Sequence, residues 1–308
     1  MKLHIIIDFM HIYYKYFFQL KAGKLKRLSA PIEWNGVVTE RDTSLIYYPI
    51  RDIENIRKGL EVDHEVTVSV CFDMKSKRVD SDTEGASEYK SGRTKNLTDV
   101  DMDNLAIIED MLSRAGHNTY RIPGYEADDI VNYLSKKYMD SFEYTIIYTN
   151  DKDLLVNIND KIGVMRFKQG KGYSQVSKAN YEAYLESEFG AFIPYNALGL
   201  FLSTVGDSAD HIKGINKFGK VAYKKLITKV SSTNKIDWTI CGDYNELAKV
   251  VEMCQPHLTG EQYKELCDSF ALVSNLEIMD NIAAPSKRST KELREATYTQ
   301  YKMLSLIP

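Results

Sequence analysis

The sequence predicts an α/β fold in which helices flank a mostly parallel sheet and a helical part follows toward the C-terminus. Up to about residue 167, short apolar and β-branched runs alternate with segments of helical periodicity, the pattern of strands joined by helical crossovers. Beyond Ser177 the pattern is helical only. The 308 residues, 44% apolar and 27% charged, are typical of a globular protein with a large core.

The clearest strand signal comes first in the chain. Residues 3–7 form an unbroken apolar run, which favours a strand buried on both faces. An aromatic-rich helix is expected at about 10–20. A second helix is expected at about 43–60, where apolar residues recur at helical spacing. The Val/Thr-rich stretch 65–72 predicts the next strand.

The same alternation continues along the chain. The next expected elements are helices at 101–115 and 126–138, strands at 118–122, 144–148 and 162–167, and a short helix near 152–156. Within the helix at 126–138, Ala127, Ile130 and Leu134 share one face, which we expect to pack inward. The polar segment 280–308 predicts a loosely packed end.

We expect two parts, an α/β domain over residues 1–194 and a helical part over 195–308. Within the first part, residues 75–96 are polar, charged and nearly free of aliphatic side chains. This stretch is too long for an ordinary connection, so we expect a functional loop or a helix ordered by a partner.

Several classes of protein are disfavoured by composition. No stretch approaches the roughly 20 apolar residues of a membrane span, and the first apolar run is too short for a signal peptide, so a cytoplasmic protein is expected. The four cysteines show no CxxC spacing, which favours buried reduced thiols over zinc or disulfides. The nucleotide-binding pattern GxxxxGK[ST] is absent from the sequence.

The charge is unevenly distributed although the net charge is only −3. Residues 211–235 contain seven lysines and no acid, whereas carboxylates gather in short clusters elsewhere. A chain with one basic stretch and one acidic pocket can hold a polyanion at the first and metal ions at the second.

Three expected strands run into aspartates: Asp8, Asp73 and Asp151. A fourth strand leads into the helix that begins with an acidic cluster, and another aspartate lies two residues beyond Asp151; these further acids are Glu126, Asp128, Asp129 and Asp153. The carboxyl ends of parallel strands lie along one edge of a sheet, where open α/β folds place their sites. Each acid taken alone is more often a helix cap, but four independent caps need not converge.

A further acidic pair, Asp207 and Asp210, is three residues apart and shares a face if helical; a solvated turn is the ordinary alternative. All of these candidate ligands are oxygen donors, which suit Mg²⁺ or Mn²⁺ rather than zinc. The expected chemistry is two-metal hydrolysis of a phosphodiester.

These segments, in this order, resemble the 5′-nuclease superfamily, which includes flap endonucleases, bacteriophage RNase H and the 5′-nuclease domain of bacterial DNA polymerase I. The resemblance covers about residues 3–227, and the abundance of Lys, Asn and Tyr suggests a phage member. It is carried by Asp8, Phe72-Asp73, Tyr89-Lys90-Ser91-Gly92-Arg93, Gly124-Tyr125-Glu126-Ala127-Asp128-Asp129, Thr149-Asn150-Asp151-Lys152-Asp153-Leu154 and Gly206-Asp207-Ser208-Ala209-Asp210-His211-Ile212-Lys213-Gly214-Ile215.

The resemblance implies a PIN-like nuclease domain followed by a helix–three-turn–helix module at about 204–230. It also implies two groups of metal ligands, with two Mg²⁺ as cofactors and Mn²⁺ as a substitute. One group would comprise Asp8, Asp73, Glu126 and Asp128, and the second would draw on Asp129, Asp151, Asp153, Asp207 and Asp210.

The polar stretch, taken as about 75–98, would form the helical arch through which a single-stranded 5′ end passes. By resemblance, Lys90 and Arg93 would contact the scissile phosphate and Lys15 would assist from the first helix. Tyr89 would stack on a base or on the arch. Ordinary solvated charge is the alternative for Lys90 and Arg93.

The basic stretch would bind duplex DNA through backbone amides and lysines, without regard to sequence. Its implied contacts are Lys213, Gly214, Lys217, Gly219, Lys220, Lys224 and Lys225. The resemblance also implies a K⁺ at this hairpin, although Lys217 replaces a usual Gly there and Val221 a common Lys. Phe9 likewise stands where the family usually has Gly.

The function implied is a structure-specific 5′-nuclease, a flap endonuclease or 5′-3′ exonuclease that acts in replication or repair and could remove RNA primers. Its nucleic-acid partner would be branched or 5′-ended duplex DNA or RNA–DNA. Its protein partners would be replication proteins such as a single-strand-binding protein, a polymerase or a clamp, and the protein itself would be a monomer. The alternatives are a non-catalytic DNA-junction-binding protein of the same fold, an acidic phosphotransfer domain and a PIN-type ribonuclease.

Overall fold

The structure is a computed structural model that describes residues 1–34, 36–74, 97–168, 170–208, 211–236, 238 and 244–274.

The main sheet of the described chain has six strands in the order β5-β4-β1-β6-β7-β8. Its strands are β1 (Lys2–Asp8), β4 (Glu65–Cys71), β5 (Asn118–Tyr120), β6 (Tyr144–Tyr148), β7 (Ile162–Lys168) and β8 (Gly172–Val176). Every neighbouring pair is parallel except β7 and β8, which are antiparallel. The mostly parallel sheet expected from the sequence is thereby confirmed.

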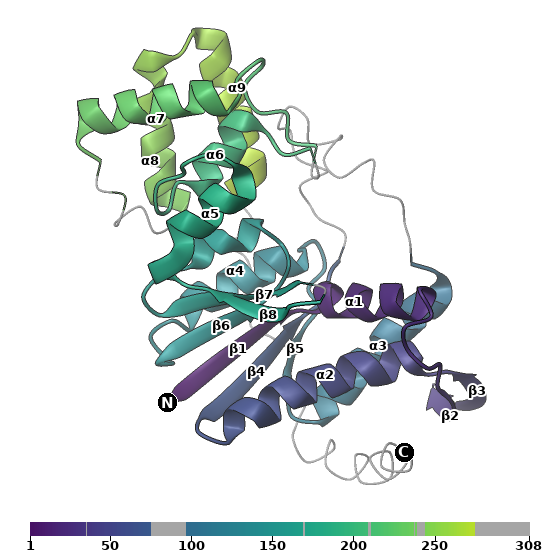
Figure 1. Ribbon diagram of the computed structural model, residues 1–308. Coiled ribbons are helices and arrows are strands. Elements are labelled where there is room, and N and C mark those ends of the chain that lie inside the picture. Colours follow the sequence, from purple (N-terminus) through teal and green to yellow (C-terminus); the bar gives the residue numbers. More distant parts are fainter. Residues whose placement is uncertain are drawn as a thin grey trace.

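Helices cover both faces of this sheet (Figure 1). The helices of the α/β part are α1 (Phe9–Lys21), α2 (Ser44–Glu61), α3 (Asp99–Arg114) and α4 (Ala127–Lys137). In the central strand β1, Ile5 and Ile7 pack with α1, α2 and α3, whereas Ile6 points to the opposite face and packs with α4. The unbroken apolar run of β1 is explained by burial on both sides.

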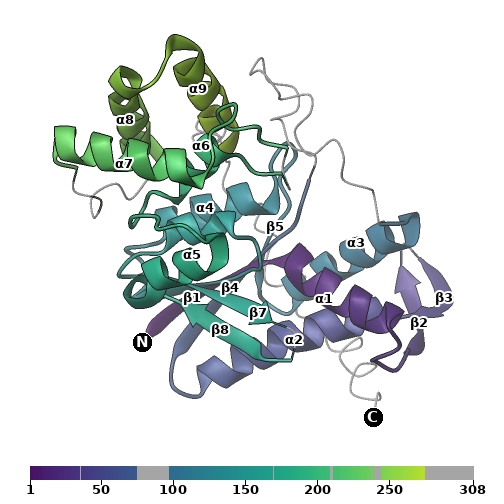
Figure 2. The same ribbon diagram turned by 45° about the horizontal axis from the view of Figure 1, so that its top comes forward.

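After β8, the part of the chain that the structure describes contains helices and no further strand, and it packs on the α4 side of the sheet (Figure 2). Its helices are α5 (Tyr181–Phe189), α6 (Leu198–Val205), α7 (Lys220–Asn234), α8 (Tyr244–Cys254) and α9 (Gly260–Ser274). Leu202 of α6 and Tyr223 of α7 belong to the same buried cluster as Ile130 of α4. The division of the chain at residue 194/195 stays a prediction.

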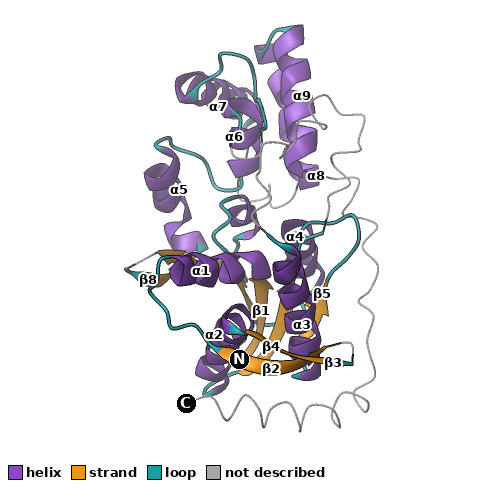
Figure 3. Cartoon of the chain, turned by 90° about the vertical axis from the view of Figure 1, so that its right-hand side faces the viewer, coloured by secondary structure: helices purple, strands orange, loops and turns teal. Residues whose placement is uncertain are grey.

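Two elements were not anticipated. A two-stranded hairpin, β2 (Ser29–Trp34) and β3 (Val37–Asp42), lies between α1 and α2 in the chain. It stands away from the sheet in Figure 1, and in Figure 3, viewed from that side, it lies in front of the sheet. Strand β8 adds an antiparallel edge to the sheet. In β2 the half-buried residues Ala30, Ile32 and Trp34 alternate with exposed ones, but β3 is almost wholly exposed, with Val37 60% and Val38 65% exposed. Only one strand of the hairpin therefore carries the alternation that reveals a strand in sequence.

No helix among the described residues is long and apolar enough to cross a membrane. The described cysteines are Cys71, Cys254 and Cys267, and all three are free thiols.

Candidate metal and nucleic-acid site

Parallel register brings the strand-end acids to one edge of the sheet. Asp8, the last residue of β1, pairs with Cys71 of β4, two residues before Asp73. On the other side, Ile7 pairs with Tyr148 of β6, three residues before Asp151. The electrostatic neighbours of Asp8 are Asp73, Asp151 and Asp128, which come from three other segments of the chain.

Asp8 does not cap the helix that follows it. Its side chain makes no capping hydrogen bond to α1 and instead accepts a hydrogen bond from the Thr149 hydroxyl, with Oγ1 2.8 Å from Oδ2. Burial raises the pKa of the Asp8 carboxyl to about 8, and the charges of Asp73, Asp151 and Asp128 add to the rise. A carboxyl crowded by three others is a place where a cation relieves repulsion.

The N-terminus of α4 holds the next group of acids. The Asp73 Oδ1 accepts the backbone N–H of Ala127 at 2.7 Å, which joins β4 to the first residue of α4. Glu126 and Asp129 cap each other's backbone amides, and Asp128 accepts the Asp129 N–H at 2.7 Å. The capping role foreseen for single acids is therefore real for Glu126 and Asp129, and Asp73 likewise accepts an amide at the start of α4.

Three of these acids can share a ligand. Oxygen atoms of Glu126, Asp128 and Asp129 all lie within 4.8 Å of one another. Carboxylates at this separation, beside the positive end of a helix, form a donor set that fits a hard divalent cation.

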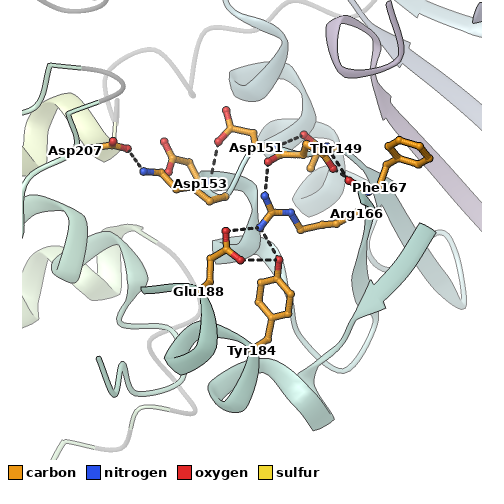
Figure 4. Close-up of polar contacts among 10 residues, drawn as sticks. Thr149, Asp151, Asp153, Arg166, Phe167, Tyr184, Glu188 and Asp207 are labelled. Atoms are coloured by element: carbon orange, nitrogen blue, oxygen red, sulfur yellow. Dashed lines mark hydrogen bonds and ion pairs between the residues drawn. The ribbon is translucent and has the colours of Figure 1, made fainter. Parts of the chain in front are cut away.

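The loop after β6 carries Asp151 and Asp153 and is built from its own hydrogen bonds (Figure 4). The Thr149 hydroxyl that donates to Asp8 also accepts the Asp151 N–H at 2.9 Å. The Asp151 Oδ1 accepts the Asp153 N–H, also at 2.9 Å. Thr149 thereby links two acids that are far apart in sequence.

The same loop is fastened to β7. The Asn150 side chain donates to the Phe167 carbonyl at 3.0 Å and accepts the Phe167 N–H at 2.8 Å. Arg166 donates to the Asn150 carbonyl at 2.6 Å and to the Tyr184 hydroxyl of α5 at 2.7 Å (Figure 4). The loop position is therefore determined by β7 and α5 as well as by β6.

Asp207 enters the site from the C-terminal helical part. It follows α6 and forms a backbone bridge with Ile212, with both N–H to O distances 2.8 Å. Its buried Oδ2 lies 2.7 Å from the Lys152 Nζ, and the Lys152 ammonium also interacts electrostatically with Asp153 and Asp151. Lys152 thus connects Asp207 with the β6 loop.

The turn between α6 and α7 depends on two glycines that touch. Gly206 and Gly214 have positive φ angles of 88° and 67°. A Cβ added to Gly214 would lie 2.4 Å from the Gly206 nitrogen and 2.8 Å from the Thr204 carbonyl. Beyond this contact, the Ile215 N–H donates to the Thr204 carbonyl at 2.9 Å, which closes the turn.

The basic surface lies on this turn and on the first turns of α7, which Gly219 caps with extended backbone. Its exposed lysines are Lys213, Lys217, Lys220, Lys224, Lys225 and Lys229. Lys217, in place of the family's glycine, keeps a positive φ of 56°. Val221 is 71% exposed on the same helix, so its side chain is available at the surface without a charge.

The expected role of Lys15, to assist substrate binding from the first helix, stays a prediction. Its side chain is only 10% exposed and pairs with Asp52 of α2 at 2.8 Å. Its Nζ also lies 4.5 Å from the ring centroid of Phe167 and 4.9 Å from that of Tyr173. Breaking a pair this buried leaves an uncompensated charge, so the Lys15–Asp52 pair also stabilises the packing of α1 against α2.

Four expected site residues, Tyr89, Lys90, Arg93 and Asp210, lie outside the described residues, as does the proposed arch apart from its last two positions. Phe9 is buried in the first turn of α1 with its ring centroid 4.6 Å from that of Phe72, where it fills core space.

Sequence reasoning did not weigh Thr149, Asn150, Lys152 and Arg166 as site residues. Thr149, Asn150 and Lys152 lie inside the motif 149–154, which was singled out for its aspartates. Their place in that motif is the one sequence feature that could have indicated a role in the site. Nothing local marks Arg166, because its partners Asn150 and Tyr184 are 16 and 18 residues away.

The pKa of Asp8 predicts a pH-dependent stability in the absence of metal. The folded-state pKa of about 8 exceeds the ordinary value of 3.8, so between these pH values the folded protein keeps a proton that the unfolded chain has lost. Stability therefore falls as the pH rises. In a chelator, we expect Tm to drop by roughly 5 °C between about pH 5 and pH 8. Differential scanning calorimetry measures this.

Asp8→Asn is the control for that slope, since it removes the titrating group, and saturating Mg²⁺ should flatten the slope in the unmodified protein. A Tm that stays constant over this pH range in chelator would contradict the crowding of carboxylates around Asp8.

Comparison with known proteins identifies the family to which this sequence is similar. Residues 3–189 match the family described as the 5′-3′ exonuclease, N-terminal resolvase-like domain. The chain is 26% identical over 265 residues to the thermostable DNA polymerase I of Thermus thermophilus, covering 84% of this chain and 26% of that protein. It is 24% identical over 186 residues to the 5′-3′ exonuclease of Bacillus subtilis, covering 60% of this chain and 59% of that one. The chain thus spans about a quarter of the polymerase and about three fifths of the exonuclease.

Solved structures show the same fold. The bacteriophage T5 5′-exonuclease with bound zinc ions has a TM-score of 0.58 at 15% identity, over 97% of this chain and 99% of that one. A bacteriophage T5 flap endonuclease in a pseudo-enzyme-product complex with DNA and metal ions has a TM-score of 0.57 at 15% identity, over 98% of this chain and 100% of that one.

Proposed function

Because this chain belongs to the family of 5′-3′ exonuclease N-terminal resolvase-like domains, we propose that it is a structure-specific, divalent-metal-dependent 5′-nuclease. Its substrate is branched or 5′-ended duplex DNA, or RNA–DNA, and it hydrolyses phosphodiesters near the 5′ end. The complex of the T5 flap endonuclease with DNA and metal ions supports this choice of substrate.

The observation that carries the proposal is that carboxylates from three other segments of the chain surround Asp8. Hydrogen bonds from amides at the start of α4 account for Asp73 and Asp129, but no cap requires Asp8 to lie among Asp73, Asp128 and Asp151 with a pKa raised to about 8. A fold tolerates such crowding when cations bind there in the working state.

The proposed ligands fall into two groups around that centre. Asp8, Asp73, Glu126 and Asp128 would hold one Mg²⁺, and Asp129, Asp151, Asp153 and Asp207 would hold the second, some of them through water. The chemistry supplied by two such ions would be a lower pKa of the attacking water and stabilisation of the phosphoryl transition state. Thr149 orients Asp8 and Asp151 through its two hydrogen bonds, and Arg166 holds the loop of Asp151 against β7.

The turn between α6 and α7 binds the duplex in this proposal. The exposed lysines of the turn and α7 contact phosphates, and the backbone amides at the start of α7 add a site for a further phosphate. Contacts of this kind read no bases, so the shape of the nucleic acid selects what is cut.

Product mapping tests the function directly. The full chain is incubated with Mg²⁺ and 5′-labelled substrates that differ only at the junction: a flap, a nick and an RNA-primed duplex. We expect cleavage near the junction or 5′ end, absent in chelator and on a single strand of the same sequence. Tight junction binding without cleavage in Mg²⁺ or Mn²⁺ would instead support the non-catalytic binder.

Lys217→Gly is expected to stabilise the protein while weakening duplex binding. The positive φ of Lys217 costs a side-chain residue energy that glycine does not pay, so the free energy of unfolding should rise by about 0.5–1 kcal/mol. Loss of one phosphate contact should reduce the slope of log K against log salt by about one. Denaturant unfolding and a salt series of duplex binding measure the two effects.

Lys224→Gln is the matched control, because it removes a charge from α7 without relieving backbone strain. It should weaken binding to a similar extent and leave stability unchanged within about 0.5 kcal/mol. A lower free energy of unfolding for Lys217→Gly would contradict the expectation that the left-handed backbone conformation of Lys217 costs stability.

A further inference from the structure

Lys152 occupies an unusual position among the acids of the site. It lies between Asp151 and Asp153 in sequence, and its Nζ is 2.7 Å from the Oδ2 of Asp207. The Lys152 side chain is 29% exposed, whereas that of Asp207 is 3% exposed. The ammonium is therefore a partly accessible positive charge placed on a buried carboxylate.

The two partners differ in their freedom to move. Asp207 is fixed by the reciprocal backbone hydrogen bonds with Ile212 and by the touching glycines Gly206 and Gly214. Lys152 reaches it through a flexible four-carbon stem, and its backbone begins the short 3-10 helix η3 (Asp153–Asn157). If the pair separates, the lysine side chain is the group that moves.

We propose that Lys152 is a built-in counter-cation, which neutralises Asp207 in the ion-free protein and competes with the second divalent ion for that carboxylate. The inference rests on the proposed function. A second cation within a few ångströms of the same oxygen would be repelled by the ammonium, so Lys152 must release Asp207 before a divalent ion binds there. Lys152 thereby raises the concentration of divalent ion that is needed to occupy the second metal position.

A purely structural role is the alternative, since the Lys152 Nζ also lies 5.9 Å from the Phe189 ring centroid of α5. In that case Lys152 would hold η3 and α5 together, and losing it would loosen the acidic site. The two roles predict opposite changes in metal affinity. A structural lysine aids metal binding, whereas a competing lysine opposes it.

Binding of Mn²⁺ to the full-length protein without DNA separates the two roles. Lys152→Met keeps most of the apolar stem and removes the charge. Titration calorimetry, with free Mn²⁺ followed by electron paramagnetic resonance, gives the number and affinity of bound ions. We expect the second ion to bind about tenfold more tightly to Lys152→Met than to the unmodified protein. In chelator, the Tm of Lys152→Met should fall because Asp207 is left buried without its counter-charge.

Two further variants sharpen the comparison. Lys152→Arg keeps the positive charge, so the second Mn²⁺ should bind to it as weakly as to the unmodified protein. Lys161→Met removes an equal charge from the exposed pair of Lys161 with Asp140, 2.8 Å apart, and should leave both affinities unchanged. It therefore controls for the net charge of the protein.

The outcomes are distinguishable from a failure of the proposed function. Second-ion affinity that is unchanged or weaker in a folded Lys152→Met overturns the competition while leaving the nuclease proposal in place. If the unmodified protein binds no divalent cation, both proposals fail together. Tighter binding in Lys161→Met to the same extent would reduce the effect to net charge and overturn the specific role of Lys152.

Discussion

Replacing Asp73 by asparagine is expected to lower the rate of metal-dependent flap cleavage at least about a thousandfold while the protein stays folded. The amide oxygen of asparagine can still accept the Ala127 N–H, which the Asp73 Oδ1 now accepts at 2.7 Å, so the start of α4 keeps its contact. What disappears is the negative charge beside Asp8. Single-turnover cleavage of a 5′-labelled flap at saturating Mg²⁺ measures the loss.

The same variant should behave differently when metal is removed. Asp73 is the largest charge contribution to the raised pKa of Asp8, so Asp73→Asn lowers the repulsion and should raise Tm in chelator at about pH 8. Asp63→Asn, at an exposed position after α2, is the control and should change neither rate nor Tm. Cleavage by Asp73→Asn within tenfold of the unmodified protein would remove the basis of the proposed mechanism.

Gly214→Ala is expected to lower the free energy of unfolding by about 3 kcal/mol or more and to abolish tight duplex binding. The added methyl would lie 2.4 Å from the Gly206 nitrogen and 2.8 Å from the Thr204 carbonyl. Both neighbours are backbone atoms, so relief requires the turn between α6 and α7 to open. Thermal unfolding and equilibrium binding to a blunt duplex measure the two effects.

Gly59→Ala provides the comparison for that change. Gly59 lies exposed within α2, and nothing lies within 4 Å of an added Cβ, so alanine there should stabilise the helix by up to about 1 kcal/mol. A Gly214→Ala protein with the Tm and duplex affinity of the unmodified chain would show that the glycine contact is dispensable.

Much of the sheet could be predicted from local sequence, because strands buried on both faces are apolar without interruption. Strand β6 was expected at the residues where it occurs, and β1 within one residue at either end. No described residue of the hairpin β2–β3 is fully buried, so the hairpin lacks the uninterrupted apolar run of a strand buried on both faces. Strand β8 is short and pairs on one side only, and its pairing depends on the turn after β7.

For the candidate site, the acids could be predicted from the sequence, but the residues that hold them in position could not. An aspartate after an apolar run is visible in sequence, and the parallel sheet then brings Asp8, Asp73 and Asp151 together. The hydrogen bond from Thr149 to Asp8 joins residues 141 positions apart and depends on the register of β1 against β6. The burial of Lys15 against Asp52 depends in the same way on how α1 and α2 pack.

The order in which the chain supplies these acids has a consequence for its biosynthesis. The first arrives at residue 8 and Asp207 only after two thirds of the chain, and each is positioned by neighbours from another crossover. A nascent or truncated polypeptide that lacks β6 and the loop after it also lacks Thr149, the hydrogen-bond donor to Asp8. It also lacks Asp151 and Asp153, which complete the acidic cluster. Under the proposed function, nuclease activity would therefore require the finished fold, because the acidic cluster is complete only when β6 and Asp207 are in place.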